Sequence, residues 1–111
     1  MRGFAVIQLA LLRHGHTSWN RLGRIQGRTD IELDDDARAQ LAALRLPAPW
    51  DQADIVSSPL SRAVETAKLV SGRTPETCLA LTEMDWGAWE GKRGVDLIAD
   101  PSSGFRDIEH W

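Results

Sequence analysis

A short segment near the start of the chain carries residue types that suit chemistry on an anion. Arg13, His14 and Gly15 directly follow the apolar residues 6–12. A guanidinium binds anionic oxygens, a neutral imidazole is a nucleophile near pH 7, and glycine lets a ligand approach the backbone closely. These residue types in sequence therefore predict a site where a nucleophile meets an anionic group.

Two later residues have related chemistry. Arg62 lies in the first turn of a predicted helix, where the helix dipole disfavours a cation by about 0.3–1 kcal/mol. A bound phosphate would reverse that penalty. The alternative is an arginine that reaches solvent or Asp54, and the local sequence favours neither. A carboxylic acid can protonate a leaving oxygen, and Glu83, Asp85 and Glu90 are all candidates for that role.

Three apolar segments of strand length must position these polar residues. They are residues 6–12, 53–57 and 77–81, and helical patterns separate them. Strands that alternate with helices predict an α/β fold with a mainly parallel sheet flanked by helices. Because the carboxyl ends of parallel strands meet at one edge of a sheet, we expect the polar residues that follow each strand to converge there.

The helices are predicted from caps and apolar periodicity. One begins at the aspartates 34–36 and ends near Leu46, one has Ser58 as its N-cap and Pro59 in its first turn and runs to about Val70, and a short one covers residues 95–99. The aspartates suit a helix N-terminus, so we interpret them as caps and not as a metal site. The tryptophan-rich residues 86–91 are predicted to form a loop.

Composition places the chain among small globular domains. It has 111 residues, 42% of them hydrophobic, and a net charge of −3, which indicates neither a nucleic-acid nor a membrane partner. No segment is long enough to span a bilayer. The single cysteine, Cys78, is expected in the core and excludes an internal disulfide, so the predicted location is the cytoplasm.

Three motifs along the chain resemble those of the histidine phosphatase superfamily, which includes the phosphoglycerate mutases. They are Arg13-His14-Gly15 with Thr17 and Asn20, residues 57–67 around Arg62, and Glu83 with residues 86–91. The resemblance covers about residues 8–96 but only the N-terminal part of the family pattern. It therefore implies a single, incomplete phosphoglycerate mutase-like domain over residues 1–111.

The resemblance also implies a mechanism. His14 would attack a phosphomonoester and form a phosphohistidine, which water or a second hydroxyl then discharges. Arg13, Arg62 and Asn20 would bind the phosphate oxygens, and Glu83 would protonate the leaving oxygen. This chemistry requires no metal and no other cofactor.

Phosphatases and mutases of this family share that chemistry. Residues 23–30 are more similar to the small phosphatases, and Gln26 and Gly27 would then lie near the substrate. Hydrolysis of a small phosphorylated metabolite is therefore the favoured function, with phosphoglycerate mutase activity as the alternative. Similarity of fold leaves the natural substrate open.

Two histidines depart from the family pattern. His16 stands where a glutamate is commonest, and with His14 it forms a His-x-His pair that raises a metal site as a weak alternative. The family has a second catalytic histidine on a later strand. His110, the one remaining histidine, does not match it, because no apolar strand precedes it and no glycine follows.

In the family the strand with that second histidine inserts between the first two strands in sequence. Without it, the inner edges of those two strands would be unpaired, and each buried unpaired backbone group costs about 1–3 kcal/mol. We consider three explanations. The chain is a fragment of a longer protein, or a second copy or a missing C-terminal segment completes its sheet, or it is a truncated protein that only binds anions.

Overall fold

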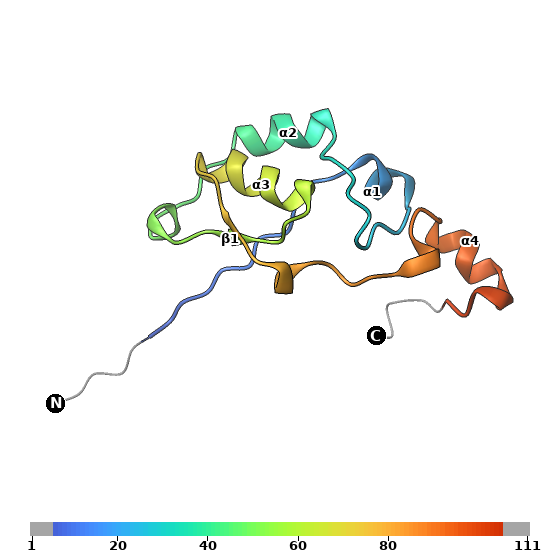
Figure 1. Cartoon of the computed structure of the whole chain (residues 1–111). Coiled ribbons are helices and arrows are strands. Elements are labelled where there is room, and N and C mark those ends of the chain that lie inside the picture. Colours follow the sequence, from blue (N-terminus) through green and yellow to red (C-terminus); the bar gives the residue numbers. More distant parts are fainter. Residues whose placement is uncertain (1–5, 106–111) are drawn as a thin grey trace.

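The computed structural model describes residues 6–105, which form helices and a short two-stranded parallel sheet (Figure 1). In chain order the elements are α1 (Ser18–Leu22), α2 (Asp35–Ala42), β1 (Val56–Ser57), α3 (Ser61–Ser71), β2 (Glu76–Thr77) and α4 (Gly94–Ala99). Short 3₁₀ turns lie at Trp50–Gln52, Leu79–Leu81, Gly87–Trp89 and Pro101–Ser103. The predicted class, a parallel sheet flanked by helices, is confirmed.

The sheet is smaller than predicted. β1 and β2 pair in parallel, with Val56 opposite Glu76 and Ser57 opposite Thr77. The predicted strands 53–57 and 77–81 are therefore too long, and the second also begins one residue late. Residues 79–81 form a 3₁₀ turn instead, in which Leu81 N–H donates to the Cys78 carbonyl at 3.0 Å. This turn takes the chain out of the strand directly after the paired residues.

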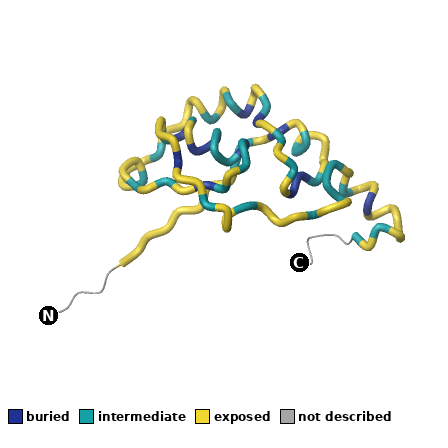
Figure 2. Tube along the Cα trace, in the orientation of Figure 1, coloured by how far each residue is buried: buried dark blue, intermediate teal, exposed yellow. Residues whose placement is uncertain are grey.

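Residues 6–12, which we call the N-terminal arm, do not form the predicted strand. The arm is extended, and Ile7 and Leu11 are each 90% exposed (Figure 2). A strand is stabilised by hydrogen bonds to a neighbouring strand, and within residues 6–105 the arm has no such partner. The apolar composition of the arm is therefore typical of a strand, but the prediction of a formed, buried strand was wrong.

Helix α2 begins as predicted and ends early. Asp34 is its N-cap and accepts a hydrogen bond from the Ala37 N–H at 2.8 Å, which confirms the capping role of the aspartates. The helix ends at Ala42, four residues before the predicted end at Leu46. After Ala42 the hydrogen bonds change to the shorter 3₁₀ spacing, since Ala43 N–H and Leu44 N–H donate to carbonyls only three residues earlier.

Helix α3 starts two residues later than predicted, and its N-cap residue is Leu60 and not the predicted Ser58. The Ser58 hydroxyl accepts a hydrogen bond from Leu60 N–H at 3.2 Å and so holds residues 58–60 in a turn. Asp30 comes from a different part of the chain, and its carboxylate accepts the Ser61 N–H at 2.8 Å and the Ser61 hydroxyl at 2.6 Å. The N-terminus of α3 is thus capped by a tertiary contact. The predicted helix at residues 95–99 is confirmed as α4.

The core is small for a chain of this length. Helix α2 packs against α3, and the buried apolar residues are Leu33, Ala37, Ala67, Val70 and Leu97. Cys78 is only half-buried, so its predicted core position was wrong. The radius of gyration is 17.1 Å, compared with about 13 Å for a compact domain of about 100 residues. His110 lies outside the described residues.

Candidate functional site

One groove brings the predicted site residues together. Its volume is about 740 Å³, and its walls come from the N-terminal arm, β1 and α3. All seven site residues predicted from the sequence line it: Arg13, His14, Asn20, Gln26, Gly27, Arg62 and Glu83. The N-terminal arm and the residues around β1 both line the groove, as expected if the backbone edges that face it are unpaired.

The backbone after the arm fixes the ring of His14. Gly15 N–H donates to the Thr66 hydroxyl of α3 at 3.0 Å, and a Cβ at Gly15 would lie 2.7 Å from a methyl carbon of Leu41. His14 Nδ1 lies 2.6 Å from the Gly15 carbonyl oxygen. Because a carbonyl only accepts, Nδ1 carries the proton in the neutral ring, which leaves a lone pair on Nε2. His14 is thus oriented for attack through Nε2.

The surroundings of His14 keep its ring neutral at pH 7. Partial burial lowers the pKa of the imidazole, because the charged form loses hydration. The hydrogen bond to Gly15 acts in the opposite direction, while the positive charges of Arg62 and Arg13 lower the pKa further and Glu83 raises it slightly. The net pKa lies below its ordinary value, so the nucleophilic form predominates at neutral pH.

Arg62 is the largest fully buried side chain of the described residues, with 1% exposure. Its Nη1 donates to the Thr29 carbonyl at 2.8 Å and its Nη2 donates to the Gly27 carbonyl. Burial lowers the pKa of this guanidinium, and the carboxylates of Glu83, Asp30 and Glu90 oppose that shift. An arginine keeps its charge in proteins, so this is a fixed cation at the groove.

The alternative interpretation of Arg62, in which it reaches solvent or Asp54, is wrong. The two backbone hydrogen bonds use two of the five guanidinium N–H groups and hold the plane of the group in place. The remaining N–H groups suit phosphate oxygens, which accept several hydrogen bonds at once. Its position in the first turn of α3 also brings it close to a helix N-terminus.

Residues 26–29 form a loop that carries both carbonyl partners of Arg62. Gly27 has φ +55, and a Cβ there would lie 2.6 Å from a carboxylate oxygen of Glu90. Gln26 is buried, and its Oε1 accepts the Thr17 hydroxyl at 2.6 Å. The close approach of Glu90 therefore requires glycine at position 27, and the buried hydrogen bond from Thr17 holds Gln26 in place.

Asn20 belongs to a capping box at the start of α1. Its Oδ1 accepts the Thr17 N–H at 2.9 Å, while the Thr17 hydroxyl accepts the Asn20 N–H at 3.2 Å. Because the oxygen of the Asn20 side chain is bound to Thr17, its amide nitrogen is the atom available as a donor to a ligand in the groove. Arg13 is exposed and lines the same groove.

The three candidate acids differ in position. Glu83 lines the groove, and Arg28 Nε donates to its carbonyl at 3.0 Å. Asp85 accepts the Gly87 N–H in a local turn, outside the lining of the groove. Desolvation raises the pKa of Glu90, but hydrogen bonds from Thr29, from the Arg28 backbone and from Trp86 outweigh it and hold the pKa at about 2. Glu90 is therefore ionised at neutral pH and unsuited to donate a proton.

His16 lies outside the lining of the groove that contains His14. Its side chain is exposed, and its backbone carbonyl accepts the Asp34 N–H at 3.0 Å. Within residues 6–105, no group of three or more histidine, cysteine, aspartate or glutamate side chains lies close enough to hold a metal ion.

Sequence reasoning missed the residues that hold the site in place. The Thr66 hydroxyl accepts the Gly15 N–H and donates to the Arg62 carbonyl at 2.7 Å, so it connects the segment of His14 with that of Arg62. Thr29 bridges Arg62 and Glu90. Thr66 is four residues after Arg62, on the same side of a helix, and that spacing is the one sequence signal for its contact.

Comparison with known proteins agrees with this geometry. The profile of the histidine phosphatase superfamily (branch 1) matches residues 9–111. The chain is 41% identical to an acid phosphatase of Mycobacterium tuberculosis over 76% of this chain and 43% of the relative. It is 35% identical to a glucosyl-3-phosphoglycerate phosphatase of Mycolicibacterium vanbaalenii, over 96% of this chain and 50% of that one. The chain belongs to the histidine phosphatase superfamily.

Solved structures match to a similar extent. The protein TTHB049 from Thermus thermophilus is 40% identical, with a TM-score of 0.69 over 81% of this chain and 50% of that chain. A phosphoserine phosphatase from Entamoeba histolytica, in complex with 3-phosphoglyceric acid, is 36% identical with a TM-score of 0.65 over 79% and 45%. The present chain therefore spans about half the length of the relatives it matches. Within the described residues, no helix could cross a membrane.

Proposed function

We propose that this chain carries the nucleophile and much of the phosphate site of a phosphomonoester hydrolase that works through a phosphohistidine on His14. The observation that carries the proposal is the fixed His14 ring, with Nδ1 held by the Gly15 carbonyl, in one groove with the buried cation of Arg62. A neutral nucleophile beside a fixed cation suits attack on a phosphate dianion.

In the proposed reaction, Nε2 of His14 attacks phosphorus and displaces the alcohol in line. Arg62, Arg13 and the Asn20 amide stabilise the nonbridging oxygens, and Glu83 delivers a proton to the leaving oxygen. Water then attacks the phosphohistidine, its proton passes to Glu83, and inorganic phosphate and the starting imidazole are restored. Gln26 and Gly27 border the substrate. The cycle uses no metal or cofactor.

Hydrolysis is favoured over phosphoryl transfer to a second hydroxyl. Several relatives are named phosphatases, including the acid phosphatase and the glucosyl-3-phosphoglycerate phosphatase. We propose a small phosphorylated metabolite as the substrate and the cytoplasm as the location, since one cysteine fits a reducing compartment. We further propose that residues 1–111 belong to one domain, completed by a further segment or by a second copy that covers the groove.

The test is phosphoenzyme formation. The chain is incubated with a generic phosphomonoester carrying a radioactive phosphoryl group, in EDTA, and then analysed for acid-labile label. We expect label on the original chain and on the control His16→Ala, and none on His14→Ala, since His14 lines the groove and His16 does not. Label on His14→Ala would overturn the assignment of the nucleophile. Phosphate binding without label or turnover in any variant would show a protein that only binds anions.

A further inference from the structure

The side chain of Thr66 joins two segments of the proposed site. Its hydroxyl accepts the Gly15 N–H at 3.0 Å and donates to the Arg62 carbonyl at 2.7 Å. Thr66 is only 3% exposed, so both hydrogen bonds are shielded from water and are strengthened by the low local dielectric. One buried hydroxyl thereby connects the backbone beside His14 with the first turn of α3.

Thr66 lines the groove but is not suited to bind the phosphate itself. A hydroxyl has one proton, and the structure uses that of Thr66 in the hydrogen bond to the Arg62 carbonyl. A phosphate dianion only accepts hydrogen bonds, so it would have to take this proton away from the carbonyl. The contacts of the Thr66 hydroxyl therefore favour a role that acts through Gly15 and not on the substrate.

Gly15 needs a directional contact, because glycine rotates more freely about its backbone than any other residue. Leu41 of α2 packs so closely against it that a Cβ would lie 2.7 Å from a methyl carbon. Apolar packing is non-directional and leaves the orientation of a peptide group open. The Thr66 hydroxyl fixes the peptide group before Gly15, and the Asp34 N–H holds the His16 carbonyl at 3.0 Å. The Gly15 carbonyl lies between these two anchors along the chain.

The direction of the Gly15 carbonyl matters because His14 Nδ1 lies 2.6 Å from its oxygen. If this carbonyl turned away, the ring proton would be free to move to Nε2, and the lone pair that attacks phosphorus would be lost from that atom. We propose that Thr66 is a positioning residue for the nucleophile, whose hydroxyl fixes Gly15 and thereby keeps the lone pair of His14 on Nε2. This inference rests on the proposed function, since it takes His14 as the nucleophile.

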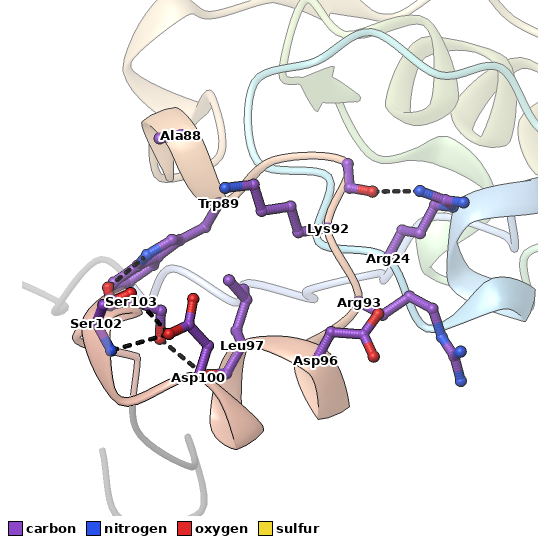
Figure 3. Close-up of a pocket in the computed structure, with 11 residues that line it drawn as sticks. Arg24, Ala88, Trp89, Lys92, Arg93, Asp96, Leu97, Asp100, Ser102 and Ser103 are labelled. Carbon is purple, nitrogen blue, oxygen red and sulfur yellow. Dashed lines mark hydrogen bonds between the residues drawn. The ribbon is translucent and has the colours of Figure 1, made fainter.

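Three variants test the role of the hydroxyl. Thr66→Val keeps the shape of the side chain and removes both hydrogen bonds, whereas Thr66→Ser keeps the hydroxyl. Ser103→Ala is the matched control, because the Ser103 hydroxyl also accepts a backbone N–H, from Phe105 at 3.1 Å, and donates to a backbone carbonyl, that of Leu97 at 2.7 Å. Ser103 lines a second cavity, shown in Figure 3, and not the groove of His14.

The nitrogen chemical shifts of the His14 ring report its tautomer by NMR, at a pH above the usual histidine pKa of about 6.5. We expect the Nδ1-protonated form to predominate in the original chain, in Thr66→Ser and in Ser103→Ala, and to lose population to the Nε2-protonated form in Thr66→Val. The rate constant for labelling by radioactive p-nitrophenyl phosphate should fall at least about tenfold in Thr66→Val, since a small misplacement of reacting groups costs up to about 10²-fold. The ester concentration for half-maximal labelling should change little, because Thr66 does not bind the phosphate.

The proposal is overturned if Thr66→Val keeps the original tautomer or the original rate constant, or if Ser103→Ala shifts the tautomer to the same extent. Loss of the Nδ1-protonated form in Thr66→Ser also overturns it, since that variant keeps the hydroxyl. If Thr66→Val does not fold, hydrogen exchange of the Gly15 N–H decides. Slow exchange in the original chain and in Thr66→Ser supports the proposal, and rapid exchange in either overturns it. If even the original chain takes up no label, the proposed function fails, and the tautomer still decides the role of Thr66.

Discussion

His14 owes its chemical state to contacts that involve very few atoms. One carbonyl oxygen fixes the tautomer, and partial burial beside Arg62 and Arg13 lowers the pKa of the ring. None of these contacts involves a residue of β1 or β2. The proposed nucleophile is therefore oriented by local contacts, with Gly15 and with α3.

This state predicts a pH dependence of labelling at His14. Because the folded pKa is lowered, the ring stays neutral until the pH falls below the usual histidine value of about 6.5. The rate of phosphoenzyme formation should hold its plateau to a lower pH than that value. Protonation of the folded ring is disfavoured, so it also lowers stability as the pH falls further. Titration of the His14 ring protons by NMR measures this, and a midpoint above 6.5 would contradict it.

Gly27 gives a second prediction at the scale of one residue. Gly27→Ala places a Cβ at positive φ and within 3 Å of Glu90 and Trp86, so it should destabilise the fold by about 1–3 kcal/mol. Gly23→Ala is the control, because Gly23 has φ +70 but open space around it. Its cost should be limited to about 1 kcal/mol of backbone strain. Urea unfolding measures both, and equal losses would contradict a steric role for Gly27.

At the scale of elements, the site depends on loops held together by side chains. Glu90, in the segment after β2, accepts hydrogen bonds from the Thr29 N–H at 2.7 Å and from the Trp86 N–H at 3.0 Å. The Thr29 carbonyl in turn accepts a hydrogen bond from Arg62 of α3. One ionised carboxylate thereby fixes the position of a loop, a turn and the principal cation of the groove.

This arrangement predicts how stability varies with acid. The pKa of Glu90 is about 2 in the folded chain and about 4.3 in an unfolded one. Its stabilising effect is therefore complete above about pH 4.3 and is lost as the pH falls towards 2. In Glu90→Gln the free energy of unfolding should be lower at pH 6 and should decline less between pH 4.5 and 2.5. Urea titrations across this range measure it, and parallel curves for the two proteins would contradict it.

For the whole molecule, the main feature is apolar surface that the chain leaves uncovered. The N-terminal arm, Val56 of β1 and Leu79 after β2 are all substantially exposed. Figures 1 and 2 show the arm extending away from the helices. Unpaired, apolar, extended segments add readily to another strand. The shape of the molecule is also elongated, with extents of 60 × 39 × 22 Å.

We therefore expect the 111-residue chain to self-associate. Its sedimentation should show species above the monomer mass at tens of micromolar concentration, and Ile7→Ser with Leu11→Ser should shift the distribution towards monomer. Val95→Ser with Ile98→Ser is the control, because these residues of α4 are exposed but lie far along the chain from the arm. A chain that stays monomeric at all concentrations would contradict the expectation.

The sequence predicted which candidate residues would lie together better than it predicted the bounds of the strands and helices around them. The seven candidate residues line one groove. They could be identified from the sequence because they belong to local motifs, Arg13-His14-Gly15 above all, whose residue types have specific chemistry. The length of each strand depends on its partner, which no local pattern contains. The arm is strand-like in composition but unpaired, and the strand predicted at 77–81 turns away after Thr77.

By itself, the sequence determined the family, the parallel α/β class and which residues could carry the chemistry, because these depend on residue type and short spacing. Only the tertiary structure decided what Arg62 and Glu90 do. Arg62 can be buried because its guanidinium donates hydrogen bonds to two carbonyl groups of a distant loop. Glu90 is ionised because a backbone N–H of the same loop donates to its carboxylate. Contacts between distant segments set burial and hydrogen bonding, and these in turn set charge state and orientation.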